Sequence, residues 1–191
     1  MAESRVQVSP LNEGEQQLLR KIAHVSLLLD GYDDLFSDFD PRPYSQRRLS
    51  DDFMVEAKKA VKDKASGSLE LLLLLPAAKR KPGLENVIRR RLRDYFTKFY
   101  ESLQRERQAV IRQGALFIIL GFCFMVITTF ILIYTAKQAF LLTLLIVILE
   151  PAGWFLFWEG LNLIIFESKR KAPDMRFYEK MASCAIGFHS Y

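Results

Sequence analysis

Two long apolar stretches lie almost back to back in this chain. Residues 114–135 contain no Asp, Glu, Lys, Arg or His, and a second apolar stretch covers residues 139–158. About 20 apolar residues suffice for a helix to cross the hydrocarbon core of a bilayer. The sequence therefore predicts a transmembrane hairpin with a short external turn at Lys137 and an interfacial segment that continues to residue 166. The alternative is the buried core hairpin of a soluble protein, which two adjacent stretches of this length disfavour.

The positive charge of the chain gathers on both sides of this apolar block. Residues 67–113 carry eleven basic and five acidic side chains, and residues 168–191 carry five basic and two acidic ones. Because lysine and arginine are enriched in the cytoplasmic flanks of membrane spans, we expect a multi-pass protein of the inner or plasma membrane with both termini in the cytoplasm. Nucleic-acid binding is less favoured, since no recognition motif accompanies the charge. The candidates for contact with anionic lipid headgroups or a protein partner are Arg89, Arg90, Arg93, Lys98, Lys169, Arg170 and Lys171.

These patterns divide the chain into three parts. Residues 1–113 are predicted to form a cytoplasmic α+β domain that ends in a long basic amphipathic helix. Residues 114–166 are expected to form the transmembrane hairpin, and residues 167–191 a cytoplasmic tail. The predicted fold class is an α-helical membrane protein, in which a two-helix transmembrane hairpin carries a small cytoplasmic α+β domain built from the N-terminal region and the C-terminal tail.

Local patterns predict the elements before the basic helix. Apolar residues at helical spacing predict an amphipathic helix over residues 12–30. The aspartates, prolines and serines of residues 32–49 are typical of an ordered loop. Ser50 followed by two aspartates predicts the start of a helix that runs to about Lys64.

The later elements follow from similar patterns. The apolar run 69–75 is short and bounded by turn residues, which favours a strand. A long helix is predicted from Leu84, and nothing breaks it before Gly114, so that it can continue into the membrane. The tail is expected to form a short helix from Asp174 and then a strand over residues 184–191 that could pair with residues 69–75.

The dipeptide Glu150-Pro151 lies at the centre of the second apolar stretch. Glu150 is about 18 Å from the turn, near the bilayer midplane, where a charge is costly and a carboxyl group suggests function. Pro151 lacks an N–H group and is expected to break the helix and free a carbonyl, a combination that suits a cation or a proton. The alternative is a protonated Glu150 that donates to this carbonyl and has no transport role. Glu159 and Asn162, three residues apart, are expected at the headgroups or at a pore mouth.

Small residues recur every seven positions in both apolar stretches. Gly114, Gly121 and Thr128 lie in the first, and Gly153 and Gly160 lie in the second. Small residues in a stripe allow helices to approach closely in lipid. The stripe could serve packing within the hairpin, contacts between chains, or both.

Catalytic and metal-binding patterns are not evident. No histidine and cysteine pair has metal-ligand spacing, and there is no glycine-rich phosphate loop. The aspartates of the 32–49 loop do not match a calcium loop and are expected to form turns or to pair with Arg42, Arg47 and Arg48. We therefore expect a non-enzyme without cofactor or metal.

Three functional interpretations remain open. In the first, several copies assemble and the Glu150-Pro151 break lines an ion or proton pathway. In the second, the hairpin is only an anchor for an interaction or scaffold module. In the third, the chain regulates a larger transporter to which Glu150 pairs.

Overall fold

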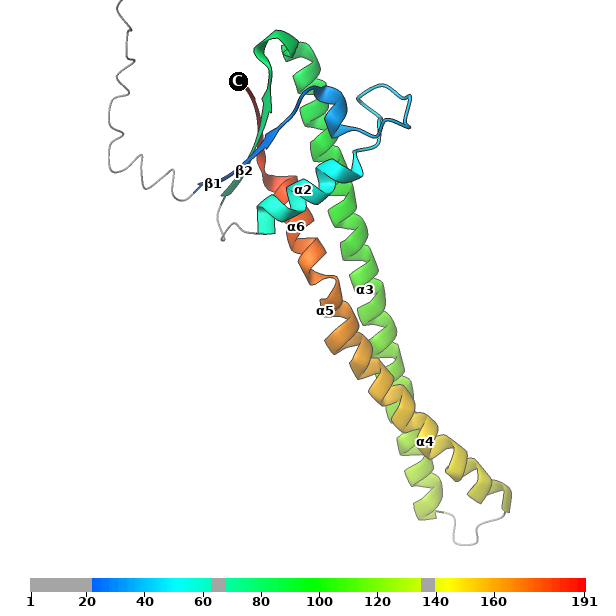
Figure 1. Ribbon diagram of the computed structural model, residues 1–191. Coiled ribbons are helices and arrows are strands. Elements are labelled where there is room, and N and C mark those ends of the chain that lie inside the picture. The colour runs from blue at the N-terminus through cyan, green and yellow to red at the C-terminus, as the bar shows by residue number, and fades with distance from the viewer. Residues whose placement is uncertain (1–21, 63–67, 135–139) are drawn as a thin grey trace, which may run out of the picture. The chain divides into compact units, whose positions relative to one another are not determined.

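The computed structural model divides the chain into two compact units, and helix α3 contributes to both (Figure 1). The sheet unit comprises the described residues up to Thr97 together with Phe177–Tyr191. The hairpin unit comprises Lys98–Arg176. The residues that the structure describes are 22–62, 68–134 and 140–191.

A three-stranded parallel sheet organises the sheet unit. Its strands are β1 (Ile22–Leu28), β2 (Ser68–Leu75) and β3 (Ala185–Ser190), in the order β1-β2-β3, so β2 lies in the centre. Each connection between neighbouring strands passes through helices, and the strand order advances in one direction. Right-handed crossovers in such a sheet place all connecting helices on the same face. The burial of Leu71 and the partial exposure of Leu72 agree with one packed and one partly open face.

Three helical segments supply the side chains that cover the packed face. They come from α2 (Asp51–Lys62), from the start of α3 (Pro82–Tyr134) and from α6 (Ala172–Ser183). The rings of Phe96 and Phe177 meet edge to face, with centroids 6.2 Å apart. The buried residues of these segments are Phe53, Met54, Ala57, Val61, Ile88, Leu92, Phe96, Phe177, Tyr178 and Met181.

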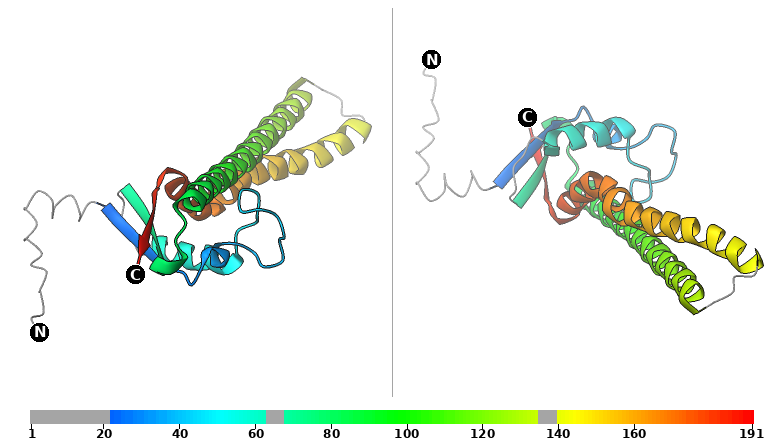
Figure 2. Two further views of the ribbon diagram at one scale, coloured as in Figure 1. Left: turned by 90° about the horizontal axis from the view of Figure 1, so that it is seen from above. Right: turned by 90° about the horizontal axis from the view of Figure 1, so that it is seen from below.

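The hairpin unit consists mainly of two helices that run side by side (Figure 2). The remainder of α3 packs against α4 (Phe140–Asn162). A π-helical turn, η3 (Leu163–Glu167), and the short helix α5 (Ser168–Arg170) follow α4. In the sheet unit, the single-turn helix η1 (Tyr32–Leu35) lies between β1 and α2, and η2 (Ala77–Lys79) lies between β2 and α3.

Much of the predicted secondary structure is confirmed. The helix from Ser50 is α2, the strand over 69–75 is β2, and the long helix from Leu84 is α3. The tail forms α6 and then β3, which pairs with β2 as expected. The loop over 32–49 is ordered by η1 and by an isolated bridge between Phe36 and Leu49.

The helix predicted over residues 12–30 is wrong where the structure describes it. Residues 22–28 form β1, while residues 12–21 lie outside the described residues. Val25 and Leu29 fit a helical spacing, but with Leu27 they also fit the alternation of a strand. Pairing with β2 selects the strand, a choice that the spacing of the apolar residues alone could not make.

The connectivity of the sheet differs from that of the predicted α+β domain. All three strands are parallel and are joined through helices, which is the α/β type of connection. The turn at Lys137 lies outside the described residues.

Candidate functional site

Four glycines form the closest contact between α3 and α4. A methyl group on Gly121 would lie 2.6 Å from the carbonyl oxygen of Gly153, and one on Gly160 would lie 2.6 Å from the carbonyl oxygen of Gly114. Thr128 continues this line and is 6% exposed. We call these five residues the glycine seam. All of them face the inside of the hairpin, so the stripe predicted from the sequence serves packing within the chain.

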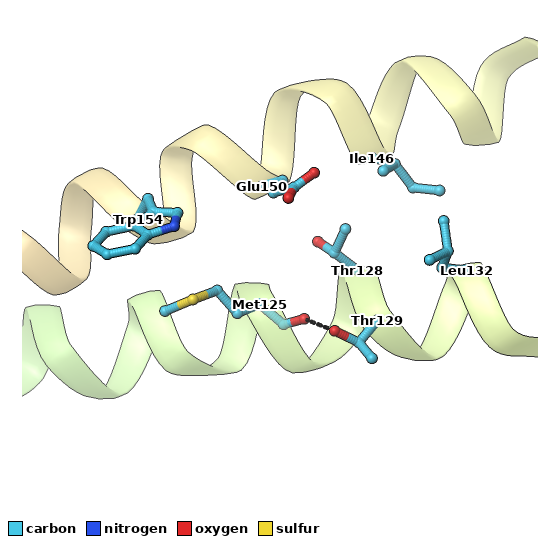
Figure 3. Close-up of a pocket in the computed structure, with 7 residues that line it drawn as sticks. All are labelled: Met125, Thr128, Thr129, Leu132, Ile146, Glu150 and Trp154. Carbon is cyan, nitrogen blue, oxygen red and sulfur yellow. Dashed lines mark hydrogen bonds between the residues drawn. The ribbon is translucent and has the colours of Figure 1, made fainter.

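A cavity of about 220 Å³ lies between α3 and α4 beyond the glycine pairs (Figure 3). The carboxyl group of Glu150 points from α4 toward Thr128 of α3. Apolar side chains make up most of the remaining wall. The residues that line the cavity are Met125, Thr128, Thr129, Leu132, Ile146, Glu150 and Trp154.

Oxygen atoms dominate the polar part of this cavity. The hydroxyl of Thr128 donates to the carbonyl oxygen of Phe124 at 2.8 Å, and the hydroxyl of Thr129 donates to that of Met125 at 2.8 Å. Both hydroxyl protons are therefore used within α3, and the oxygens remain as acceptors. A mainly apolar pocket with two hydroxyl acceptors and one carboxyl group suits a proton or a water molecule.

The predicted break at Glu150-Pro151 is wrong. Helix α4 is continuous from Phe140 to Asn162 and contains Pro151 in its interior. The proline still removes one N–H donor, so the carbonyl of Val147 loses its usual partner. The apolar segments on both sides keep their own backbone hydrogen bonds, which a helix in an apolar medium strongly favours, and this accounts for the continuity.

The other predicted pathway residues lie away from the cavity. Glu159 accepts a hydrogen bond from Asn162 at 3.4 Å, and both side chains are half-buried in the last turns of α4. Nine residues of helix separate Glu159 from Glu150, which corresponds to about 13 Å. The structure therefore groups Glu150 with Thr128 and separates it from the Glu159–Asn162 pair.

The seven predicted basic contact residues occupy different settings. Arg89 is engaged within the sheet unit, where it donates to the carbonyl oxygen of Ile186 at 2.9 Å and covers the edge of β3. Arg90 and Arg93 are exposed on the same helix. In the hairpin unit, Lys98 and Lys169 are exposed, Arg170 pairs with Glu167, and Lys171 pairs with Glu106.

A buried polar cluster in the sheet unit was not predicted. Glu85 accepts from Arg80 at 2.8 Å and 3.0 Å and from the hydroxyl of Tyr32 at 3.1 Å. The Arg80 guanidinium holds the pKa of the Glu85 carboxyl below its usual value, although burial opposes this. No helical spacing links Glu85 to Arg80, five residues earlier, so no local pattern points to this pair. The cluster joins η1, η2 and α3 and therefore has a structural role.

The aspartates of the 32–49 loop pair with arginines, as the sequence suggested. Asp33 binds Arg47 at 2.7 Å, and Asp40 binds Arg42 at 2.7 Å. The Arg42 side chain and the backbone N–H of Arg48 hold the pKa of Asp40 well below its usual range. Within residues 22–62, 68–134 and 140–191, no group of three or more potential ligands could hold a metal ion.

Comparison with family models, curated proteins and solved structures gave no match for this chain.

Proposed function

We propose that this chain is an integral membrane protein whose α3–α4 hairpin anchors the sheet unit at the cytoplasmic face of the inner or plasma membrane. The exposure of the most apolar helical windows carries the proposal. Only 11% of the window in α3 and 6% of the window that begins in α4 is buried. The core hairpin of a soluble protein would bury most of such a surface, because exposed apolar patches larger than a few hundred Å² are rare in water.

The distribution of side chains around the hairpin supports the same proposal. Glycines occupy the contact between the helices, while large apolar side chains such as Phe122 and Phe155 are 60% and 68% exposed. In lipid, small residues promote close helix packing, and large apolar residues face the acyl chains. Basic residues lie after α5 and on the part of α3 before Gly114. The Lys171–Glu106 ion pair joins these two segments at one end of the hairpin. This end suits the cytoplasmic headgroups.

Charged substitutions on the outer surface of the hairpin test the anchor. Val126 and Ile148 are 48% and 58% exposed, and arginine at the centre of a span costs about 2.5–3.5 kcal/mol per residue. We expect the wild-type chain to stay in the membrane pellet after an alkaline carbonate wash. The double variant Val126→Arg/Ile148→Arg should move into the supernatant or be degraded.

The matched control is Val55→Arg, which changes a residue of similar exposure, 49%, on α2 of the sheet unit. This variant should remain in the pellet. Wild-type protein that is monodisperse in buffer without detergent would contradict the anchor.

The cavity at Glu150 supports a second candidate function. We propose that several copies together form a proton or cation pathway past Glu150, since one two-helix hairpin cannot enclose a pore. The observation that favours it is the grouping of Glu150 with Thr128 and Thr129 in one cavity between the helices. The pathway does not require a broken helix, because Glu150 lines the cavity from a continuous α4, with its side chain also exposed at the surface of the hairpin.

Replacement of Glu150 by glutamine tests the pathway. We expect proton or potassium flux into proteoliposomes of the Glu150→Gln variant to fall to the level of protein-free vesicles, because the amide cannot exchange a proton or neutralise a cation. The control Glu159→Gln changes an acid on the same helix outside the cavity and should retain the flux. The oligomer mass in detergent should be equal for all three proteins. A monomeric wild-type protein, or equal flux in the Glu150→Gln variant, would rule the pathway out.

A further inference from the structure

A groove of about 340 Å³ lies between β1 and α2 in the sheet unit. Leu27 and Leu28 end β1, and Leu29 and Asp30 follow it, so the groove lies at the carboxyl end of this strand, beside its outer edge. The residues that line the groove are Leu27, Leu28, Leu29, Asp30, Asp34, Asp52, Phe53 and Glu56.

No described strand lies on the outer side of β1. β1 is the outermost strand on its side of the sheet, and the N–H of Leu29 donates to the carbonyl oxygen of Leu74 in β2 at 2.9 Å. By the alternation of a strand, the N–H and C=O groups of Leu28 and Ser26 point away from β2. Among the described residues, the structure gives these groups no partner. Such an edge is a template for an added strand.

The opposite edge of the sheet is covered differently. On β3, Arg89 donates to the outward carbonyl of Ile186 at 2.9 Å, and its guanidinium lies over the ring of Phe188 at 5.8 Å. A charged side chain of this kind protects an edge strand from pairing. At the edge of β1, the neighbouring Leu28 is instead 65% exposed.

The rim of the groove is acidic. Asp30, Asp34, Asp52 and Glu56 contribute four carboxylates. Two lysines oppose them: Lys59 pairs with Glu56 at 2.8 Å, and Lys79 donates to the backbone carbonyl of Asp30 at 2.8 Å. Asp34 also accepts the N–H groups of Asp30 and Gly31, which fixes the turn at the end of the groove. The remaining negative charge complements a basic ligand.

We propose that this groove binds an extended, lysine- or arginine-bearing peptide segment of a partner protein, which adds to the open edge of β1 as a further strand. The backbone of the peptide pairs with the outward groups of Ser26 and Leu28. Its basic side chains, at alternate positions, reach Asp52 and Glu56, and apolar side chains between them contact the exposed Leu28. Main-chain pairing supplies affinity in this mode, and the acidic rim supplies the selection for basic sequences.

Panning of a random heptapeptide phage library against the full-length protein in nonionic detergent micelles tests the proposal. We expect the retained peptides to be enriched in lysine and arginine at alternate positions, and a selected peptide should slow hydrogen exchange at the Ser26 and Leu28 amides. Asp52→Asn/Glu56→Gln should weaken the selected peptide about tenfold, which is about 1.4 kcal/mol and in the range of two exposed ion pairs.

Matched controls separate strand addition from general charge attraction. Asp38→Asn/Asp94→Asn removes the same charge from exposed positions outside the groove and should leave the affinity unchanged. Methylation of alternate peptide nitrogens should abolish binding while keeping the charge. No enrichment over empty micelles, binding that survives methylation, or a β1 edge already protected by a second copy of the chain would overturn the proposal.

Discussion

The Gly121→Leu substitution is expected to force α3 and α4 apart and to destabilise the hairpin by about 3 kcal/mol, the upper range for overpacking of a tight contact. A Cβ atom at this position would lie 2.6 Å from both the carbonyl oxygen of Gly153 and the amide nitrogen of Phe157. These are backbone atoms, so no change of rotamer relieves the clash. The reciprocal Gly153→Leu substitution should have a similar effect, and the double variant should lose less than the sum, since one displacement relieves both clashes.

Spin labels at Ile119 and Trp158 measure the separation of the helices. Both positions are exposed on the outer surface, at 60% and 65%, so the labels leave the contact intact. We expect the distance distribution to shift to longer values in the Gly121→Leu variant. Gly83→Leu, where an added side chain meets nothing within 4 Å, is the matched control. An unchanged distance in the Gly121→Leu variant would contradict the close packing of the glycine seam.

The Arg80→Met substitution is expected to cost the sheet unit about 3 kcal/mol near neutral pH, because it leaves a buried carboxylate without its cation. The side chain of Glu85 is 6% exposed, and that of Arg80 is 29% exposed, which places the effect at the low end for a buried pair. Lys59→Met removes an exposed ion pair from the same unit and should change stability by less than about 0.5 kcal/mol.

The cost of Arg80→Met should depend on pH. The pKa of Glu85 is lowered in the folded protein, chiefly by Arg80, so this pair stabilises the fold above the unfolded pKa of the carboxyl group. That stabilisation is lost as the pH falls through the lowered folded pKa. The difference between wild type and variant should therefore shrink on acidification below about pH 4. A difference that is constant from pH 7 to pH 3 would contradict the buried pair.

The thiol reactivity of Cys184 reports the unfolding of the sheet unit in the Arg80→Met and Lys59→Met variants. Cys184 is 2% exposed in the sheet unit, and burial raises the pKa of its thiol to about 11, so it reacts only when the unit opens. A urea titration of the full-length Cys123→Ala protein in detergent, with 4,4′-dithiodipyridine as the thiol reagent, gives the unfolding midpoint at neutral and at acidic pH.

The sequence was most informative where a pattern repeats over many residues. The structure contains the long helix predicted from Leu84, and the glycines spaced by seven residues lie in the contact between α3 and α4. Both features repeat regularly in the sequence, so they could be recognised from it. The strand β1 was mistaken for a helix, since Val25 and Leu29 satisfy both periods and only pairing with β2 decides between them.

The surroundings of Glu150 could not be predicted from the sequence for a related reason. Glu150 stood out because an acid in an apolar stretch is costly, whereas its position facing Thr128 depends on the helix rotation that the glycine seam fixes. The break at Pro151 did not form, because the local effect of proline was outweighed by the helix around it. The Arg80–Glu85 pair depends on the turn η2, which no sequence period predicts.

Sided cysteine labelling tests the membrane hairpin most directly. In the Cys123→Ala background, single cysteines are placed at Gln138, between the two apolar stretches, and at Ser102, which is exposed on α3 before them. A membrane-impermeant maleimide added to intact cells should label the Gln138→Cys protein, and should label the Ser102→Cys protein only after the membrane is opened. In the wild-type protein, Cys123 should stay unlabelled in intact cells and in opened membranes, and should react only after detergent is added. Labelling of Ser102→Cys from outside intact cells, or of Cys123 without detergent, would contradict the hairpin as a membrane anchor with the sheet unit in the cytoplasm.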